Sequence, residues 1–484
     1  MTNYLDLSII DINKKLKNKE IKPLDLVLEV FDRIDKNKHL NCFITLNKDE
    51  AIKRAKELED KEVDNLLFGI PIALKDNIVT KDLKTTCASK ILENFIPIYD
   101  AAVVEKINEK KMIIIGKTNM DEFAMGSSTQ TSYFGTVLNA WDNKKVAGGS
   151  SGGSATAVAA RLLPLSLGSD TGGSIRQPAA FNGIVGIKPT FGRISRHGLI
   201  AFGSSLDQIG PMSRNVYESA LLLNILTGHD ERDLTSVELE NEDFTRLIDS
   251  EVKGMKIAIP NFYTNDVVNQ EIRDNIKTVI MLLENKGVTF EYVDIDYIEY
   301  SIPLYQIIAL AEASSNLARF DGIKYGYRTP SFSNLDELYK KTRGEGFGDE
   351  VKRRIMIGSY VLSGENVKNY YYKALRIRKA ITESFNDILS KYDLIIGPTT
   401  TTLAYNIGDG ANDAVKSFFD DLLTIPVNMA GLPGMSLPIG FSEDNLPIGM
   451  QIIGSKFDEA TIFKLASVIE KELNLDLNPN KGDR

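Results

Sequence analysis

Two serines enclosed by glycines mark the most unusual stretch of this chain. Ser150 lies in the sequence GGSSGG (148–153), and Ser174 lies in SDTGGS (169–174), with a run of small and apolar residues between them. Each loop stands at the start of a predicted helix. Consecutive glycines permit backbone conformations and close approaches that side chains would prevent. The stretch therefore predicts a catalytic centre with two candidate nucleophiles, Ser150 and Ser174.

Composition excludes several classes of protein. The 484 residues are 43% hydrophobic and 25% charged, which is typical of an α/β enzyme or another ordinary globular protein with a large core. A net charge of −9 argues against unaided binding to nucleic acid or an anionic membrane. The two cysteines cannot form a disulfide framework, and the longest apolar run, 155–167, is interrupted by Arg161 and Pro164. We expect a cytoplasmic protein without a secretion signal or a membrane partner.

Hydrophobic periodicity predicts an α/β protein. An apolar strand over 68–74 ends at Lys75, and further strands are expected at 112–115, 163–167, 255–259, 288–295 and 394–396. Helices are expected at 23–34, 50–59, 269–286 and 459–473, and a hairpin at 435–453. No repeat or linker divides the chain. We therefore expect one domain over 1–484, with a helical segment at 1–65, a catalytic core at 66–230 and a mainly helical insertion at 300–390.

Two familiar motifs are matched only in part. Gly116-Lys117-Thr118 resembles the end of a phosphate-binding loop, but Lys111 replaces the first required glycine. The G-x-S-x-G pattern around Ser150 resembles a hydrolase nucleophile elbow, which needs a preceding strand and a histidine base. Polar residues 139–145 precede it instead. Of the three histidines, His197, in Ser195-Arg196-His197-Gly198, is the best candidate for a base, but a structural role is favoured for it as well.

Lysine is the alternative base. Lys75 follows an apolar strand, and burial lowers the pKa of a lysine until the neutral amine can take a proton. Taken alone, a lysine at a strand end more often extends its charge to solvent. The glycines beside Ser174 change that balance, because backbone N–H groups of Thr171, Gly172 and Gly173 can converge on one point as an oxyanion hole requires. A tight turn or an anion site at a helix N-terminus would also explain the glycines.

The two serine loops and Lys75 together resemble the amidase signature family. The resemblance rests on GGSSGGS (148–154), SDTGGSIRQPA (169–179) and KDN (75–77) after an apolar strand. It implies a single large α/β domain with a mixed central sheet covered by helices on both faces. It also implies that Ser174 is the nucleophile, Ser150 the bridging serine and Lys75 the base, with a cis peptide bond at Gly149–Ser150.

The resemblance extends over the whole chain to one branch of that family, the glutaminase subunits of glutamyl-tRNA(Gln)/aspartyl-tRNA(Asn) amidotransferases. Further matching segments are DEFAMGSS (121–128), EASSNLAR (312–319), VKRRI (351–355) and LTIPVN (423–428). The segment GENVKN (364–369) and His197 depart from the branch, which commonly has tyrosines there. By this resemblance, the glutamine-binding residues are Gly126, Tyr305, Arg354 and Asp421, although Arg353 and Asp420 are immediate neighbours of two of them.

The same resemblance implies partners. Ammonia released from glutamine would reach the B subunit, which uses ATP and magnesium to activate a misacylated tRNA, while the small C subunit wraps the pair. We expect no cofactor or metal in this chain, and tRNA contact mainly through the B subunit. Two other interpretations remain open: a free-standing amidase for another small amide, and a non-catalytic scaffold or anion-binding module.

Overall fold

A mixed sheet of 11 strands forms the centre of the protein. The computed structural model describes residues 3–409 and 419–479. The strand order is β1-β3-β2-β4-β6-β5-β10-β11-β9-β7-β8. The strands are β1 (Phe43–Leu46), β2 (Pro71–Lys75), β3 (Ile113–Thr118), β4 (Leu165–Asp170), β5 (Val185–Lys188), β6 (Gln208–Ser213), β7 (Lys256–Pro260), β8 (Thr289–Val293), β9 (Leu394–Pro398), β10 (Gly434–Phe441) and β11 (Pro447–Ile453).

The sheet combines parallel and antiparallel pairs. Strand β2 pairs in parallel with β3 and β4, and β7 pairs in parallel with β8 and β9. The central strands β4, β6, β5, β10, β11 and β9 are joined by antiparallel pairs. Lys75 stands opposite Thr118 at the end of β2. This confirms the predicted α/β class with a mixed central sheet.

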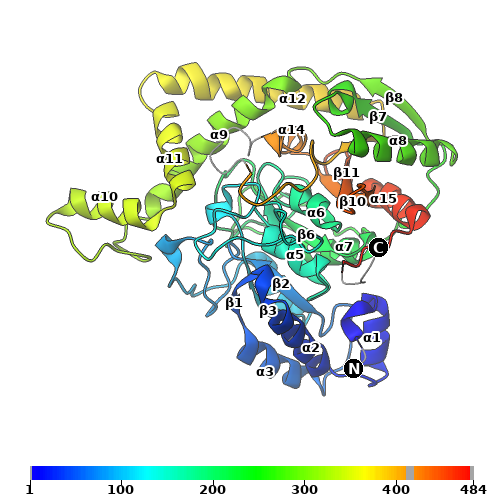
Figure 1. Ribbon diagram of the computed structural model, residues 1–484, viewed down its shortest axis with the longest axis horizontal. Helices are drawn as coiled ribbons and strands as arrows, with labels where there is room; N and C mark the ends of the chain where they lie inside the picture. Colours follow the sequence, from blue (N-terminus) through cyan, green and yellow to red (C-terminus); the bar gives the residue numbers. More distant parts are fainter. Residues whose placement is uncertain (1–2, 410–418, 480–484) are drawn as a thin grey trace.

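Helices cover the sheet, and α5 and α6 pack against its middle strands (Figure 1). In Figure 1, α10 extends away from the main body, and α11 lies between α10 and α9. The helices are α1 (Ile9–Lys17), α2 (Pro23–Lys36), α3 (Lys48–Leu58), α4 (Ala102–Glu109), α5 (Gly152–Ala159), α6 (Arg176–Asn182), α7 (Val216–Leu226), α8 (Gln270–Glu284), α9 (Ser301–Asn316), α10 (Leu335–Gly346), α11 (Asp349–Val361), α12 (Tyr372–Leu389), α14 (Ile425–Ala430) and α15 (Glu459–Leu473).

Local sequence explains most of these boundaries. Helix α2 starts at Pro23, whose ring suits the first turn, and the Asp25 carboxylate accepts the Lys22 N–H at 2.8 Å as a cap. The expected strand over 68–74 is shorter than predicted and begins at Pro71. Gly69 explains the difference, because its φ of +71° places residues 67–69 in a turn.

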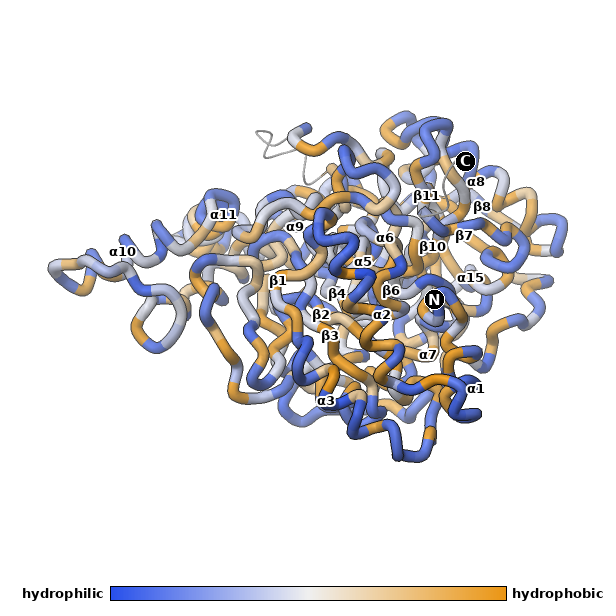
Figure 2. The backbone as a smooth tube through the Cα atoms, turned by 60° about the horizontal axis from the view of Figure 1, so that its bottom comes forward, coloured by the Kyte–Doolittle hydropathy of each residue, from blue (hydrophilic) through white to orange (hydrophobic). Residues whose placement is uncertain are grey.

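The hydrophobic core lies along the strands of the central sheet. Figure 2 shows apolar segments concentrated in the middle of the molecule, with hydrophilic segments along the outer helices and turns. Strands β2, β3 and β4 are buried at every residue. Among residues 3–409 and 419–479, no helix is both long and apolar enough to cross a bilayer.

Candidate active site

The two serine loops lie against each other above the middle of the sheet. Helix α5 begins two residues after Ser150, strand β4 returns the chain, and α6 begins two residues after Ser174. The Ser151 N–H donates to the Ser174 carbonyl oxygen at 3.2 Å. The Gly149–Ser150 peptide bond is cis, as expected. Residues 139–149 form turns and two isolated bridges instead of a strand, so the local backbone differs from that of a hydrolase elbow.

Strand β2 delivers Lys75 to both hydroxyls of the first loop. The Lys75 side chain is fully buried, and its Nζ lies 2.7 Å from Ser150 Oγ, 2.8 Å from Ser151 Oγ and 3.2 Å from the Ser169 carbonyl oxygen. Burial lowers the pKa of Lys75 to about 7, although the negative charges of Asp121, Asp170 and Asp207 oppose that shift. A neutral amine is therefore accessible near neutral pH and can take a proton from Ser150.

Ser174 is also buried, although less completely than the other two residues. It is 4% exposed, whereas Ser150 and Lys75 are completely buried. Within the part of the chain that the structure describes, its hydroxyl makes no hydrogen bond, including to Ser150. The N–H groups of the predicted donors Thr171, Gly172 and Gly173, and that of Ser174, likewise donate to no described residue. Unused N–H donors beside a serine hydroxyl are what stabilisation of an oxyanion requires.

Glycine is required at two positions of this loop. A Cβ at Gly173, whose φ is +150°, would lie 2.2 Å from Thr424 Oγ1 and 2.5 Å from Asp421 Oδ1. A Cβ at Gly172 would lie 3.0 Å from the Tyr305 ring. The glycines therefore allow Tyr305 and Asp421 to approach the backbone of the loop, so these two predicted residues lie in the same region as Ser174.

Two buried carboxylates fix the loop. Asp207 accepts the Thr171 hydroxyl at 2.7 Å and the Phe202 N–H at 2.8 Å. Asp170 forms a buried ion pair with Arg176, at 3.0 Å from both Nε and a terminal nitrogen. This guanidinium lowers the pKa of Asp170 to about 2, against the effect of burial. Asp207 thus fixes the loop through Thr171, before Ser174, and Asp170 fixes it through Arg176, after Ser174.

Helices α9 and α11 supply one wall of the site. Tyr305, on α9, meets the Phe202 ring edge-on at a centroid distance of 6.3 Å. Arg354, on α11, lies 5.7 Å from the same ring, and its Nε donates to Glu350 at 2.6 Å. Its positive charge acts on the pKa of both Tyr305 and Asp421. Helices α9 and α11 thus bring an aromatic ring and a cation to the serine loops.

The structure distinguishes Arg354 and Asp421 from their neighbours. Both arginines pair with Glu350, but the side chain of Arg354 is 4% exposed, whereas that of Arg353 is 32% exposed. Asp420 accepts hydrogen bonds from Ser127 at 2.9 Å and Tyr405 at 2.7 Å. Asp421 Oδ1 is buried and accepts none from the described residues. Burial and the charge of Asp420 raise the pKa of Asp421, so a cation at this oxygen would be strongly favoured.

Gly126 adjoins the same region. A Cβ at this position would lie 2.4 Å from Cγ of Asp121. The next residue, Ser127, contacts Asp420, and its carbonyl oxygen accepts from Gln177 at 2.9 Å. All ten predicted site residues therefore gather around the two serine loops.

Sequence reasoning missed several supporting residues. Ser151 shares Lys75 with Ser150, and Gln177 accepts the Gly149 N–H at 2.9 Å. Ser151 could have been suspected because it adjoins Ser150. Asp207 carried no sequence signal, since it lies 33 residues after Ser174 in an unremarkable segment.

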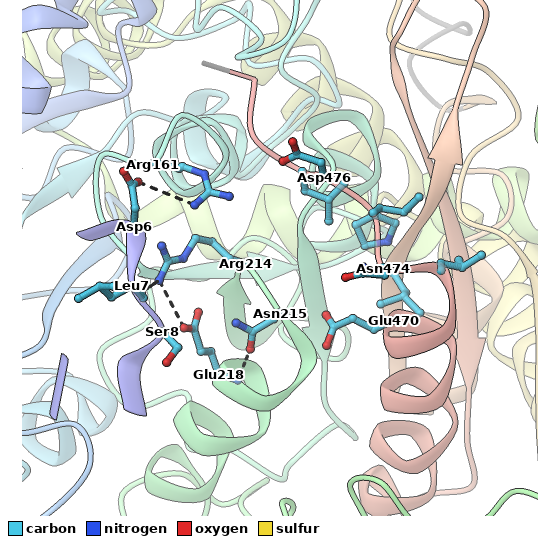
Figure 3. Close-up of a pocket in the computed structure, with 15 residues that line it drawn as sticks. Asp6, Leu7, Ser8, Arg161, Arg214, Asn215, Glu218, Glu470, Asn474 and Asp476 are labelled. Atoms are coloured by element: carbon cyan, nitrogen blue, oxygen red, sulfur yellow. Dashed lines mark hydrogen bonds and ion pairs between the residues drawn. The ribbon is translucent and has the colours of Figure 1, made fainter. Parts of the chain in front are cut away.

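The remaining motifs lie outside this arrangement. Gly116-Lys117-Thr118 forms the end of β3 rather than a phosphate loop. His197 packs on Tyr99, with the ring centroids 5.4 Å apart. A cavity of about 330 Å3 between α1, α7 and α15 (Figure 3) contains none of the predicted residues. Its Arg214 is held by the Leu5 and Leu7 carbonyl oxygens and by Glu218.

Comparison with known proteins agrees with the geometry. Residues 25–463 match the family model described as Amidase. The A subunit of glutamyl-tRNA(Gln) amidotransferase from Pediococcus pentosaceus is 53% identical over 96% of each chain, and that from Streptococcus mutans is 52% identical over 96% of this chain and 95% of the relative. The crystal structure of the corresponding Thermotoga maritima protein superposes with a TM-score of 0.82 at 40% identity, covering 97% of this chain and 96% of the other. Matched over most of its length, the chain belongs to the amidase signature family.

Proposed function

We propose that this chain is the glutaminase subunit, also called the A subunit, of a tRNA-dependent amidotransferase. It hydrolyses glutamine to glutamate and supplies ammonia for converting Glu-tRNA(Gln), Asp-tRNA(Asn) or both into their amidated forms. The observation that carries the proposal is the contact of buried Lys75 with Ser150, in the loop that adjoins Ser174 and its unused N–H donors. Relatives with that name, about half identical over nearly the full length, support it.

The proposed reaction proceeds through an ester on Ser174. Ser174 Oγ attacks the side-chain amide carbon of glutamine, and its proton passes through Ser150 to neutral Lys75. The backbone N–H groups around Thr171 to Ser174, with those of Thr171, Gly172 and Gly173 as the predicted donors, stabilise the tetrahedral oxyanion. The relay returns a proton to the leaving ammonia, and water then hydrolyses the ester. Contact between the two serine hydroxyls is needed for this transfer, and such hydrogen bonds often tighten only with substrate bound.

Glutamine recognition follows from the charges at the site. The Arg354 guanidinium would bind the α-carboxylate, for which its planar array of donors is suited. Asp421 Oδ1, buried without a hydrogen bond from the described residues, would accept the α-ammonium group. Tyr305 and Gly126 would enclose the aliphatic part of the substrate. An amide without these two charged groups would leave a buried carboxylate unpaired, so the site favours a free amino acid.

The partners belong to the same proposal. The B subunit would use ATP and magnesium to activate the misacylated tRNA and would hold most of that tRNA, and the C subunit would complete a heterotrimer in the cytoplasm. The net charge of −9 agrees with tRNA binding elsewhere. A free-standing amidase is less favoured, because relatives near 50% identity are named as components of an amidotransferase.

The direct test is Ser174→Ala in the assembled complex. We expect glutamine-dependent transamidation to be lost and ammonia-dependent transamidation to be retained, since only the ammonia source is removed. Loss of both activities would contradict the assignment of Ser174 as nucleophile. A glutamine-derived trapping agent should add its mass to Ser174 of the unsubstituted chain, and absence of that adduct would exclude an acyl-enzyme at this serine.

A further inference from the structure

A buried carboxylate on the catalytic core holds the start of the helix that carries Arg354. Glu122 lies in a short helical turn, Glu122–Ala124, directly after Asp121 and before Gly126. It is 3% exposed, and its Oε2 accepts the Gly348 N–H at 2.9 Å. Gly348 is the N-cap residue of α11 and offers no side-chain cap of its own. Glu122 therefore caps this helix from a distant part of the chain.

Both partners of the hydrogen bond between Glu122 and Gly348 are closely packed. Ser89 Oγ donates to the other carboxylate oxygen of Glu122 and lies 3.4 Å from the Gly346 carbonyl oxygen. A Cβ at Gly348 would lie 2.3 Å from Glu122 Oε2, so glycine is required for this approach. Next to it, Phe347 meets Phe123 edge-on at a centroid distance of 5.6 Å. The Glu122 carboxylate and the Phe123 ring thus both hold the junction between α10 and α11.

Because α11 is a continuous helix, the place of its N-terminus determines the place of Arg354. Arg354 lies six residues after Gly348, a rise of about 9 Å along a continuous helix. Beyond it, a Cβ at Gly358 would lie 1.9 Å from the Leu310 carbonyl oxygen, so α11 packs directly on the α9 backbone. The helix is therefore held at its start by Glu122 and near its end by α9. A shift of its start would move Arg354 relative to Phe202 and Tyr305.

We infer that Glu122 is a positioning residue for glutamine: by holding the N-terminus of α11, it sets the place of Arg354 and hence the affinity for the substrate α-carboxylate. This inference rests on the proposed role of Arg354. Glu122 touches neither serine, so its effect falls on the binding of glutamine rather than on the chemical steps.

The test uses four variants of the complete complex, assayed for glutamine hydrolysis. Glu122→Ala should raise KM for glutamine about fivefold or more, the cost of one charge-assisted hydrogen bond, while kcat changes less than about twofold. Glu122→Gln should restore most of the affinity, because an amide oxygen still accepts the Gly348 N–H. Gly348→Ala should raise KM without removing the carboxylate. Glu470→Ala is the matched control, since that buried carboxylate accepts the Val216 N–H of α7 at 2.9 Å, away from the site.

Arg354→Ala distinguishes a failure of the inference about Glu122 from a failure of the proposed carboxylate site. If it raises KM but Glu122→Ala and Gly348→Ala do not, the inference is wrong and the proposed function stands. If Arg354→Ala leaves KM unchanged, the proposed carboxylate site itself fails, and the inference fails with it. An equal rise in KM for Glu470→Ala would show a general loss of stability and would overturn the inference. If Glu122→Ala does not fold, Gly348→Ala decides by the same criterion.

Discussion

Lys75 shows how burial converts a common side chain into a base. Its Nζ has three oxygen neighbours within 3.2 Å, yet no carboxylate of residues 3–409 or 419–479 touches it, so desolvation outweighs the attraction of more distant negative charges. The strand and the lysine at its end could be predicted from the sequence, because both are local features. The second hydroxyl at Nζ, from Ser151, could not be assigned without the conformation of the loop. Side chains that act through distant partners, such as Asp207 and Glu122, left no local pattern at all.

The pKa of Lys75 predicts the pH dependence of hydrolysis. Only the neutral amine accepts the proton, so kcat/KM for glutamine should rise with pH through about 7 and become level above it. Lys75→Arg should lower hydrolysis about 10²- to 10⁴-fold, because arginine stays protonated. Steady-state rates between pH 5.5 and about 9 test both statements, and ammonia-dependent transamidation serves as the control. Near-normal hydrolysis by the arginine variant would exclude Lys75 as the base.

Ser151→Ala tests the second hydroxyl at Lys75. Removal of an acceptor 2.8 Å from Nζ should lower kcat about five- to tenfold, the cost of one hydrogen bond, and leave KM unchanged. The loss should be far smaller than for Ser150→Ala, which removes the relay itself. Ser154→Ala is the matched control, because its hydroxyl contacts Thr118 and Leu167 rather than Lys75. Equal losses for Ser151→Ala and Ser150→Ala would contradict these separate roles.

At the level of elements, the helices and strands that could be predicted are those with a regular short-range pattern of apolar residues. The hairpin β10–β11, the helix α8 and the parallel strands around β2 follow apolar patterns of the expected period. Strands β1, β5 and β6 were not predicted. Strand β6 contains Gly210 and Pro211, which disfavour a strand locally, but a Cβ at Gly210 would lie 2.0 Å from the Ile187 carbonyl oxygen. The glycine is thus required by contact with β5, a tertiary cause invisible to periodicity.

The ion pair at the start of α6 predicts a stability effect. Asp170→Asn leaves the completely buried Arg176 guanidinium without its charge partner, which should destabilise the chain by about 3–5 kcal/mol. Urea unfolding followed by circular dichroism measures the change. Asp336→Asn is the control, because its exposed pair with Lys340 should leave the unfolding midpoint unchanged. An unfolding midpoint equal to that of the unsubstituted chain would show that the Asp170 charge does not support α6.

At the level of the whole molecule, the site joins segments that are distant in the chain. The catalytic residues come from β2 and the loops before α5 and α6, whereas Tyr305, Arg354 and Asp421 come from the second half of the sequence. The central antiparallel strands of one sheet bring these halves together. The glutamine-binding residues could be named only through family resemblance, because nothing in the local sequence distinguishes Arg354 from Arg353. Substrate binding and the chemical steps thus depend on different halves of the chain. Mutations can therefore affect one of these functions without the other.

Asp421 gives the sharpest test of that division. Asp421→Asn removes the charge proposed to bind the α-ammonium group, so KM for glutamine should rise about tenfold or more, as for a lost charged hydrogen bond. Hydrolysis of 4-carbamoylbutanoate, which has the same amide and carboxylate but no amino group, should be unaffected or improved, because no cation is then needed. Asp420→Asn is the control: its carboxylate is already bound by Ser127 and Tyr405, so it should not change the preference between the two substrates. If Asp421→Asn impairs both substrates equally, the carboxylate supports the loop at Gly173 instead of recognising glutamine.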